Sequence, residues 1–145
     1  MPLLEVKGLS KSFRGLQAVR DFNLTIEPGE IVGLIGPNGA GKTTVFNLIT
    51  GHFPPTSGEV FFRGQRITGL RPYQIARRGI ARTFQNIRLF KQNSVLDNVR
   101  AAFNASLRYG LLDAIIRTPR FLAEEKRVTD RALELLELVG LRGRA

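Results

Sequence analysis

The sequence predicts an α/β fold, and three consecutive segments are the basis of that prediction. Residues Ile31–Ile35 form a short, uninterrupted apolar run, which is typical of a strand buried on both faces. The glycine-rich stretch Gly36–Gly41 follows directly. Lys42–Thr50 then has the pattern of a helix, and Gly51 stands where a helix commonly ends. A strand that runs through a glycine loop into a helix indicates a mixed architecture.

Further strands are expected on both sides of this segment. Leu4–Lys7 alternates apolar and polar residues, as an amphipathic strand does, and Phe22–Ile26 has the same character before a turn at Pro28-Gly29. Downstream, Glu59–Ile67 and the short run Ile80–Phe84 are also predicted to be strands.

The other predicted elements are helices. Pro72–Arg78 is expected to form a short one. Ser94 is a suitable N-cap for a second helix that continues to about Ala105, with Asp97 near its positive end.

The C-terminal part is predicted to be an insertion followed by a long helix. Leu107–Arg120 contains a glycine and a proline and is interpreted as an insertion or linker. Phe121–Val139 is amphipathic and Gly140 ends it, with one apolar side expected to hold Val128, Ala132, Leu135, Leu136 and Val139.

The glycine loop has a pattern that binds phosphate. Gly36, Gly41, Lys42 and Thr43 match G-x-x-x-x-G-K-[ST]. Glycines let the backbone curl so that several N–H groups point inward, and the positive end of the following helix adds to that field. The lysine supplies a full charge to the β- and γ-phosphates, and the threonine hydroxyl is placed to bind Mg²⁺. The sequence therefore predicts an ATP phosphate site.

Composition limits the alternatives. The chain has 145 residues, 43% of them hydrophobic, which is enough for a packed core, and it contains no cysteine for disulfides or thiolate metal sites. We find no secretory signal and no apolar window long enough to cross a membrane, so we expect a soluble protein of a reducing compartment. The net charge is +10, and residues 60–96 hold eight basic side chains and no acidic one. No nucleic-acid motif accompanies them, so we expect no nucleic-acid partner.

Three motifs together resemble the ATP-binding-cassette (ABC) ATPases. The loop GPNGAGKTT is the first, ARTFQNIRLF around Gln85 looks like the family's Q-loop, and Phe13, with Val19 after it, stands where the family has an aromatic residue that stacks on adenine. The resemblance implies that Gln85 contacts the Mg²⁺ or the attacking water. It implies that the phosphates are bound by Gly36, Asn38, Gly39, Ala40, Gly41, Lys42, Thr43 and Thr44.

The resemblance is strongest to the ATP-binding subunits of branched-chain amino acid importers. GPNGAGKTTVFNLITG, TGLRPYQIARRGIARTFQNIRLF and SVLDNV all look like that group. The resemblance implies that the cofactors are ATP and Mg²⁺. It implies transmembrane permease subunits and a second ATP-binding subunit as partners, and a location on the cytoplasmic face of a bacterial or archaeal membrane. Urea importers and lipopolysaccharide exporters have similar cassettes. A stand-alone nucleotide-binding module, or an unrelated P-loop kinase or GTPase, is a further alternative.

The resemblance also implies a domain plan. We expect an antiparallel β subdomain together with the P-loop strand and helix in residues 1–70, the Q-loop region in 71–94 and the start of a helical subdomain in 95–145. A complete cassette continues with a signature motif, an apolar strand that ends in the catalytic carboxylate, and a switch histidine; none of these occurs in the sequence. We therefore expect the first half of a cassette, which binds ATP without hydrolysing it, and expect Ile31–Ile35 and Ile80–Phe84 to lack their strand partners.

Overall fold

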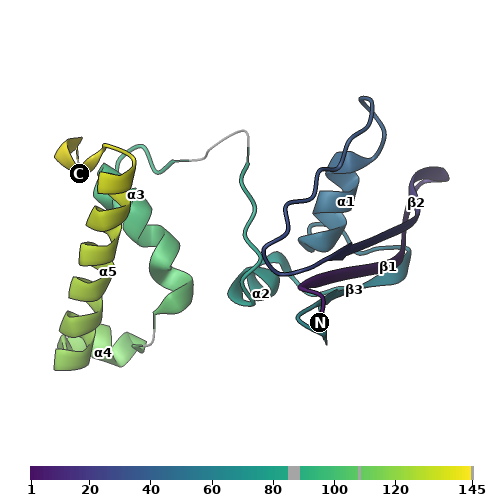
Figure 1. The fold of residues 1–145 in the computed structure, drawn as a ribbon. Coiled ribbons are helices and arrows are strands. Elements are labelled where there is room, and N and C mark those ends of the chain that lie inside the picture. The colour runs from purple at the N-terminus through teal and green to yellow at the C-terminus, as the bar shows by residue number, and fades with distance from the viewer. Residues whose placement is uncertain (85–88, 108, 145) are drawn as a thin grey trace. The chain divides into compact units, whose positions relative to one another are not determined.

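The computed structural model describes residues 1–84, 89–107 and 109–144. The chain forms two compact units, Met1–Thr83 and Phe84–Ala145 (Figure 1). The boundary between the units falls inside the range 71–94 that was expected to hold the Q-loop region.

The first unit is built on a four-stranded antiparallel sheet. Its strands are β1 (Leu4–Phe13), β2 (Leu16–Ile26), β3 (Ser57–Phe62) and β4 (Gln65–Arg66), in the order β2-β1-β3-β4. β1 and β2 are much longer than predicted, because they form one hairpin from Leu4 opposite Ile26 to Phe13 opposite Leu16. Irregularities in the register interrupt the simple alternation of apolar residues, so the sequence pattern revealed only the two outer ends of the hairpin.

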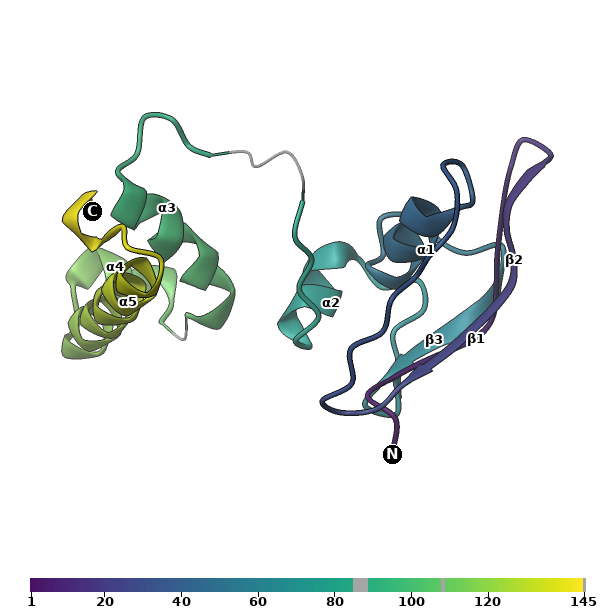
Figure 2. The ribbon, with the colours of Figure 1, turned by 45° about the horizontal axis from the view of Figure 1, so that its top comes forward.

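Two helices complete this unit: α1 (Lys42–Ile49) and α2 (Pro72–Arg77). Figure 2 shows α1 lying over the sheet. Its buried side chains join those of the strands and of α2 in one core, which consists of Val6, Leu9, Val19, Val45, Leu48, Ile49, Val60, Phe62, Ile67 and Ile75. Burial of this apolar surface is the main force that holds α1, and with it the glycine loop, against β1 and β2.

The prediction that Ile31–Ile35 forms a buried strand is wrong. The segment has no strand assignment, and its two end residues, Ile31 and Ile35, are 99% and 94% exposed. The described residues Ile80–Phe84 form no strand either. A strand exists only when its N–H and C=O groups pair with a neighbour, and within the described residues the sheet offers these segments none.

The second unit is helical. It contains α3 (Val95–Ala101), the 3-10 helix η1 (Ala102–Ser106), α4 (Leu111–Ile116), α5 (Pro119–Leu138) and the 3-10 helix η2 (Arg142–Arg144). Two helix-end residues predicted from the sequence are confirmed. Ser94 is the N-cap of α3, where its hydroxyl accepts from the Asp97 N–H at 3.0 Å. Gly140 follows the end of α5 with φ +71°. In the part of the chain that the structure describes, no helix is long and apolar enough to cross a membrane.

The expectations for the C-terminal part need correction. The range 107–120 is not simply a linker, because it contains α4, and α5 begins at Pro119 after the N-cap Thr118. Of the predicted apolar side of α5, Val128, Ala132 and Leu136 are buried, whereas Leu135 and Val139 are exposed. Helix α4 was not predicted, because its six residues carry too little periodicity to be recognised.

Polar contacts join α3 to α5 in this unit. The Arg100 guanidinium forms an ion pair with the Glu125 carboxylate, which also accepts from the Tyr109 hydroxyl at 2.7 Å. The Tyr109 ring packs edge-to-face against Phe121, with centroids 4.9 Å apart. The hydrogen bond to Glu125, helped by desolvation, raises the pKa of Tyr109 above its ordinary value.

Candidate functional site

The candidate site is the glycine loop at the N-terminus of α1. The loop turns at Asn38 and Gly39, where the Ala40 N–H donates to the Pro37 carbonyl at 3.2 Å. Gly39 and Gly41 have φ of +84° and +83°, a left-handed conformation that glycine adopts without steric cost. Gly41 is also the N-cap residue of α1, so the last residue of the loop sets the direction of the helix.

Gly41 is also held against the sheet. A Cβ atom at this position would lie 2.4 Å from the Ala18 carbonyl oxygen of β2 and 3.4 Å from a methyl group of Val19. The backbone of β2 therefore approaches the loop as closely as a hydrogen side chain allows. This contact positions the loop relative to the hairpin, and the motif pattern alone does not reveal it.

The loop and the start of β2 line an open pocket of about 350 Å³. The first turn of α1 contains no acidic residue, so nothing there opposes the positive end of the helix. Free backbone N–H groups at a helix N-terminus form a site for an anion such as phosphate. The lining residues are Leu16, Gln17, Ala18, Asn38, Gly39, Ala40, Gly41, Lys42, Thr43 and Thr44.

The ammonium group of Lys42 lies over the loop. Its Nζ donates to the carbonyl oxygen of Gly36 at 2.5 Å and to that of Pro37 at 2.6 Å. An ammonium has three donors, so these two bonds hold the charge at the loop and leave capacity for a ligand. The lysine therefore lines the same pocket as the helix N-terminus, and both carry positive charge.

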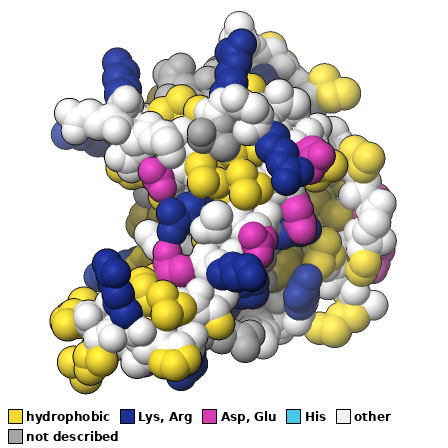
Figure 3. Space-filling view, turned by 90° about the vertical axis from the view of Figure 1, so that its left-hand side faces the viewer, with side chains coloured by type: hydrophobic (Ala, Val, Ile, Leu, Met, Phe, Trp, Pro, Cys, Tyr) yellow, Lys and Arg dark blue, Asp and Glu magenta, His cyan; other side chains and the backbone are white. Residues whose placement is uncertain are grey.

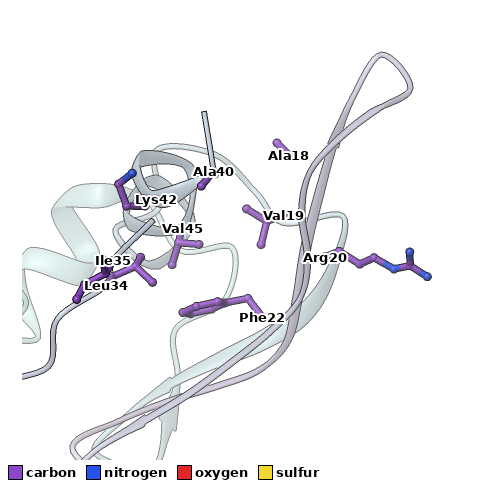
Figure 4. Close-up of a pocket in the computed structure, with 9 residues that line it drawn as sticks. All are labelled: Ala18, Val19, Arg20, Phe22, Leu34, Ile35, Ala40, Lys42 and Val45. Carbon is purple, nitrogen blue, oxygen red and sulfur yellow. The ribbon is translucent and has the colours of Figure 1, made fainter. Parts of the chain in front are cut away.

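A smaller pocket of about 190 Å³ lies next to the loop, and most of the residues that line it are apolar. In Figure 4, Val19 of β2 and Val45 of α1 face the same space, whereas Arg20 points away. Leu34 and Ile35 also line this pocket, so part of the unpaired apolar run lies beside the loop. Val19, predicted to contact the base, is a buried core residue that also lines this smaller pocket, and its contact with a base stays a prediction.

The aromatic residue expected to stack on adenine lies at the end of β1. Phe13 is 38% exposed, packs edge-to-face on Phe53 with centroids 5.5 Å apart, and has the Lys11 ammonium 5.1 Å from its ring centre. It does not line the phosphate pocket, but Leu16, its partner across the hairpin, does. The partly exposed Phe13 ring therefore lies directly across the hairpin from a residue of the pocket. Its stacking on adenine stays a prediction.

Residues Leu16, Gln17 and Ala18 are the part of the site that sequence reasoning missed. They follow the turn at Arg14 and Gly15 and reach the loop only because the hairpin folds over α1. Their residue types carry no signal for phosphate binding.

The residues present fit a magnesium ion only in part. Thr43 is exposed in the pocket, and its hydroxyl is the oxygen ligand that Mg²⁺ prefers when it also binds phosphate oxygens. Among the described residues no group of three or more His, Cys, Asp or Glu side chains gathers to hold a metal, so such an ion would depend on the phosphates. Gln85, the second expected ligand, lies outside the described residues.

The chain is similar in sequence to proteins of known family. The sequence pattern of ABC transporters matches residues 19–145. The branched-chain amino acid transport ATP-binding protein LivG of Escherichia coli is 49% identical over 140 residues, which cover 97% of this chain and 55% of LivG. The corresponding protein BraF of Pseudomonas aeruginosa is 45% identical over the same shares. The lipopolysaccharide export protein LptB of Escherichia coli is 39% identical over 94% of this chain and 51% of LptB.

A solved structure agrees with the sequence relatives. A nucleotide-free ATP-binding cassette from an ABC transporter superposes with a TM-score of 0.75 at 30% identity, over 99% of this chain and 56% of its own. The chain thus spans about half the length of the curated relatives it matches. With the glycine loop, the lysine and the helix N-terminus in one pocket, the chain belongs to the ABC transporter family of ATP-binding cassettes.

Proposed function

We propose that this chain binds Mg-ATP as part of the ATP-binding subunit of an ABC importer. The observation that supports the proposal is the pocket in which the Lys42 ammonium and the N-terminus of α1 lie beside the loop amides. Gly39 and Gly41 hold the loop in the curled form, and the approach of β2 to Gly41 fixes its position.

Each part of the pocket has a distinct role toward the nucleotide. The loop amides and the helix N-terminus receive the phosphate oxygens, and Lys42 exchanges its bonds to the loop carbonyls for bonds to the β- and γ-phosphates. The Thr43 hydroxyl is the protein ligand for Mg²⁺, with Gln85 as the second. The ion, when bound, neutralises charge on the phosphates. Phe13 stacks on the adenine.

Residues 1–145 by themselves are proposed to bind ATP without hydrolysing it. Hydrolysis requires a group that positions the attacking water and positive charge that stabilises the transition state. The sequence contains neither the signature motif nor the carboxylate that follows an apolar strand in this family. A loop that binds ground state and transition state equally does not raise the chemical rate. Steady phosphate release by the purified chain that Lys42→Ala abolishes would contradict this part.

The proposed solute is a branched-chain amino acid. LivG and BraF are 45–49% identical to this chain, whereas LptB is 39% identical. Permease subunits and a second ATP-binding subunit are the proposed partners, at the cytoplasmic face of the membrane; one solved cassette at 25% identity is described as dimeric. Restored leucine uptake in cells that lack LivG, with the intact protein supplied, tests the solute; restored urea uptake or lipopolysaccharide export in the matching strains, without leucine uptake, would refute it.

The binding site is tested by calorimetric titration with Mg-ATP. Lys42→Ala removes a charge-assisted bond worth about 1.5–3 kcal/mol, so affinity should fall about ten- to a hundredfold. Lys126→Ala, which removes the same charge from α5, is the matched control and should leave affinity unchanged. Phe13→Ala should weaken ATP binding but leave inorganic triphosphate binding unaffected. Equal ATP affinity for the Lys42→Ala variant and the unmodified chain would refute the proposal.

A further inference from the structure

The short segment of residues 53–56, between α1 and β3, lies along the end of β1. The Thr56 N–H donates to the Ser10 carbonyl at 2.9 Å, and the Thr56 hydroxyl accepts from the Ser12 N–H at 3.1 Å. The pairing of β1 with β3 reaches as far as Ser10 opposite Ser57, so these two bonds continue the contact beyond the sheet ladder. The segment therefore has a defined place beside the last residues of β1.

The end of β1 carries Phe13, the residue proposed to stack on adenine. The Phe13 ring packs edge-to-face against the ring of Phe53, with centroids 5.5 Å apart and planes at 82°. The Lys11 ammonium lies 5.1 Å from the centre of the Phe13 ring and donates to the Pro54 carbonyl at 2.6 Å. Two residues of the 53–56 segment thus act on one ring, Phe53 directly and Pro54 through the lysine.

Exposure alone does not distinguish Phe53 from other apolar residues of the chain. Phe53 is 40% exposed, and Phe46, Tyr73 and Phe90 are more exposed. Figure 3 shows apolar side chains among basic and acidic ones on one face of the molecule. Phe53 differs from such residues because its ring contacts the ring of a residue in the proposed nucleotide site.

We propose that Phe53 is a positioning residue for the base, because it holds the Phe13 ring in the orientation that stacks on adenine. This role rests on the proposed function, since Phe53 acts only through the stacking of Phe13. An exposed ring without a neighbour samples several rotamers. A second ring at nearly a right angle favours one of them, because the edge of one ring is attracted to the face of the other. A ring held in this way loses less conformational entropy when the base binds.

Phe53 is itself anchored on the helix that forms the phosphate pocket. The Phe53 N–H donates to the Asn47 carbonyl at 3.4 Å, and the His52 N–H donates to the same carbonyl at 2.8 Å. Asn47 belongs to α1, whose N-terminus lines the pocket. The ring that orients Phe13 is therefore attached to the element that binds the phosphates, and this contact connects the base end of the site with the phosphate end.

Calorimetric titration of the intact protein with Mg-ADP and with pyrophosphate separates binding of the base from binding of the phosphates. ADP has no γ-phosphate to hydrolyse, and pyrophosphate has no base. Phe53→Ala should weaken ADP binding about three- to tenfold, the range that an aromatic pair supplies, and leave pyrophosphate binding unchanged. Phe53→Tyr keeps the ring and should restore ADP affinity.

Phe61→Ala is the matched control. Phe61 lies on β3, and its ring also has a lysine nearby, with the Lys7 ammonium 5.3 Å from the ring centre. It lines neither of the two pockets beside the glycine loop. Removal of this ring should leave the affinities for ADP and pyrophosphate unchanged.

A double-mutant cycle tests whether Phe53 acts through Phe13. Phe13→Ala should weaken ADP binding by itself. If Phe53 only orients that ring, Phe53→Ala should cause no further loss when it is added to Phe13→Ala. A residue with a purely structural role would instead lower the affinities for ADP and pyrophosphate by the same factor in both backgrounds.

Three results would overturn the role of Phe53. The first is unchanged ADP affinity for Phe53→Ala. The second is an equal loss for ADP and pyrophosphate, which would mean that Phe53 stabilises the fold. The third is the same loss of ADP affinity with and without the Phe13 ring. The stacking itself fails separately: Phe13→Ala would then keep its ADP affinity while Lys42→Ala loses pyrophosphate affinity, and the role of Phe53 would be refuted with it.

Discussion

The structure makes a quantitative prediction about two glycines of the phosphate loop. Gly39 and Gly41 have almost the same backbone conformation, with φ of +84° and +83°. An alanine in the left-handed region costs roughly 1–2 kcal/mol at either position. The surroundings differ, however. A Cβ at Gly39 would meet nothing within 4 Å, whereas one at Gly41 would lie 2.4 Å from the Ala18 carbonyl oxygen.

Gly39→Ala should therefore show the conformational cost alone. A penalty of 1–2 kcal/mol corresponds to a factor of about 5–30 in the fraction of chains with the curled loop, and ATP affinity falls by the same factor. In Gly41→Ala the same cost is joined by a backbone contact of 2.4 Å that must open by at least about 0.6 Å, because non-bonded carbon and oxygen atoms do not approach below roughly 3 Å. β2 must then move away from the loop, and the affinity should fall at least tenfold further.

Calorimetric titration with Mg-ATP measures both losses, and circular dichroism during heating verifies that the sheet and α1 still form in each variant. If Gly41→Ala and Gly39→Ala lose affinity equally, the approach of β2 does not position the loop. If neither variant loses affinity, the loop binds ATP in a conformation other than the one described here, and the reasoning fails.

Three further predictions concern pH dependence and stability. The Tyr109 phenol should ionise above its ordinary pKa of 10.0, so the stability that it contributes is present below pH 10 and is lost as pH rises through the higher value. Ultraviolet titration of a Tyr73→Phe background, which leaves one tyrosine, checks this, and Glu125→Gln should lower the value; an unchanged value would refute the cause. Ser94→Ala should cost about 1 kcal/mol of stability in the helical unit, measured by urea unfolding with Ser94→Thr as the control. Leu9→Ala, at a side chain with 0% exposure, should destabilise the sheet unit by about 2–5 kcal/mol in the same assay, and a loss below 1 kcal/mol would mean that this core is loosely packed.

Sequence by itself determined the features that depend on neighbouring residues. The curled glycine loop was predictable because its conformation follows from glycines that reach positive φ, and its charge from one lysine and one helix N-terminus. The N-cap at Ser94 and the end of α5 at Gly140 were predictable for the same reason: the bonds involved join residues three to five positions apart.

Tertiary structure alone decided whatever depends on pairing between distant segments. The apolar run Ile31–Ile35 has the composition of a buried strand, but composition cannot supply a neighbour for its N–H and C=O groups. Leu16–Ala18 joined the candidate site without any local signal, because hairpin register and the burial of α1 bring β2 within 2.4 Å of the Cβ position of Gly41.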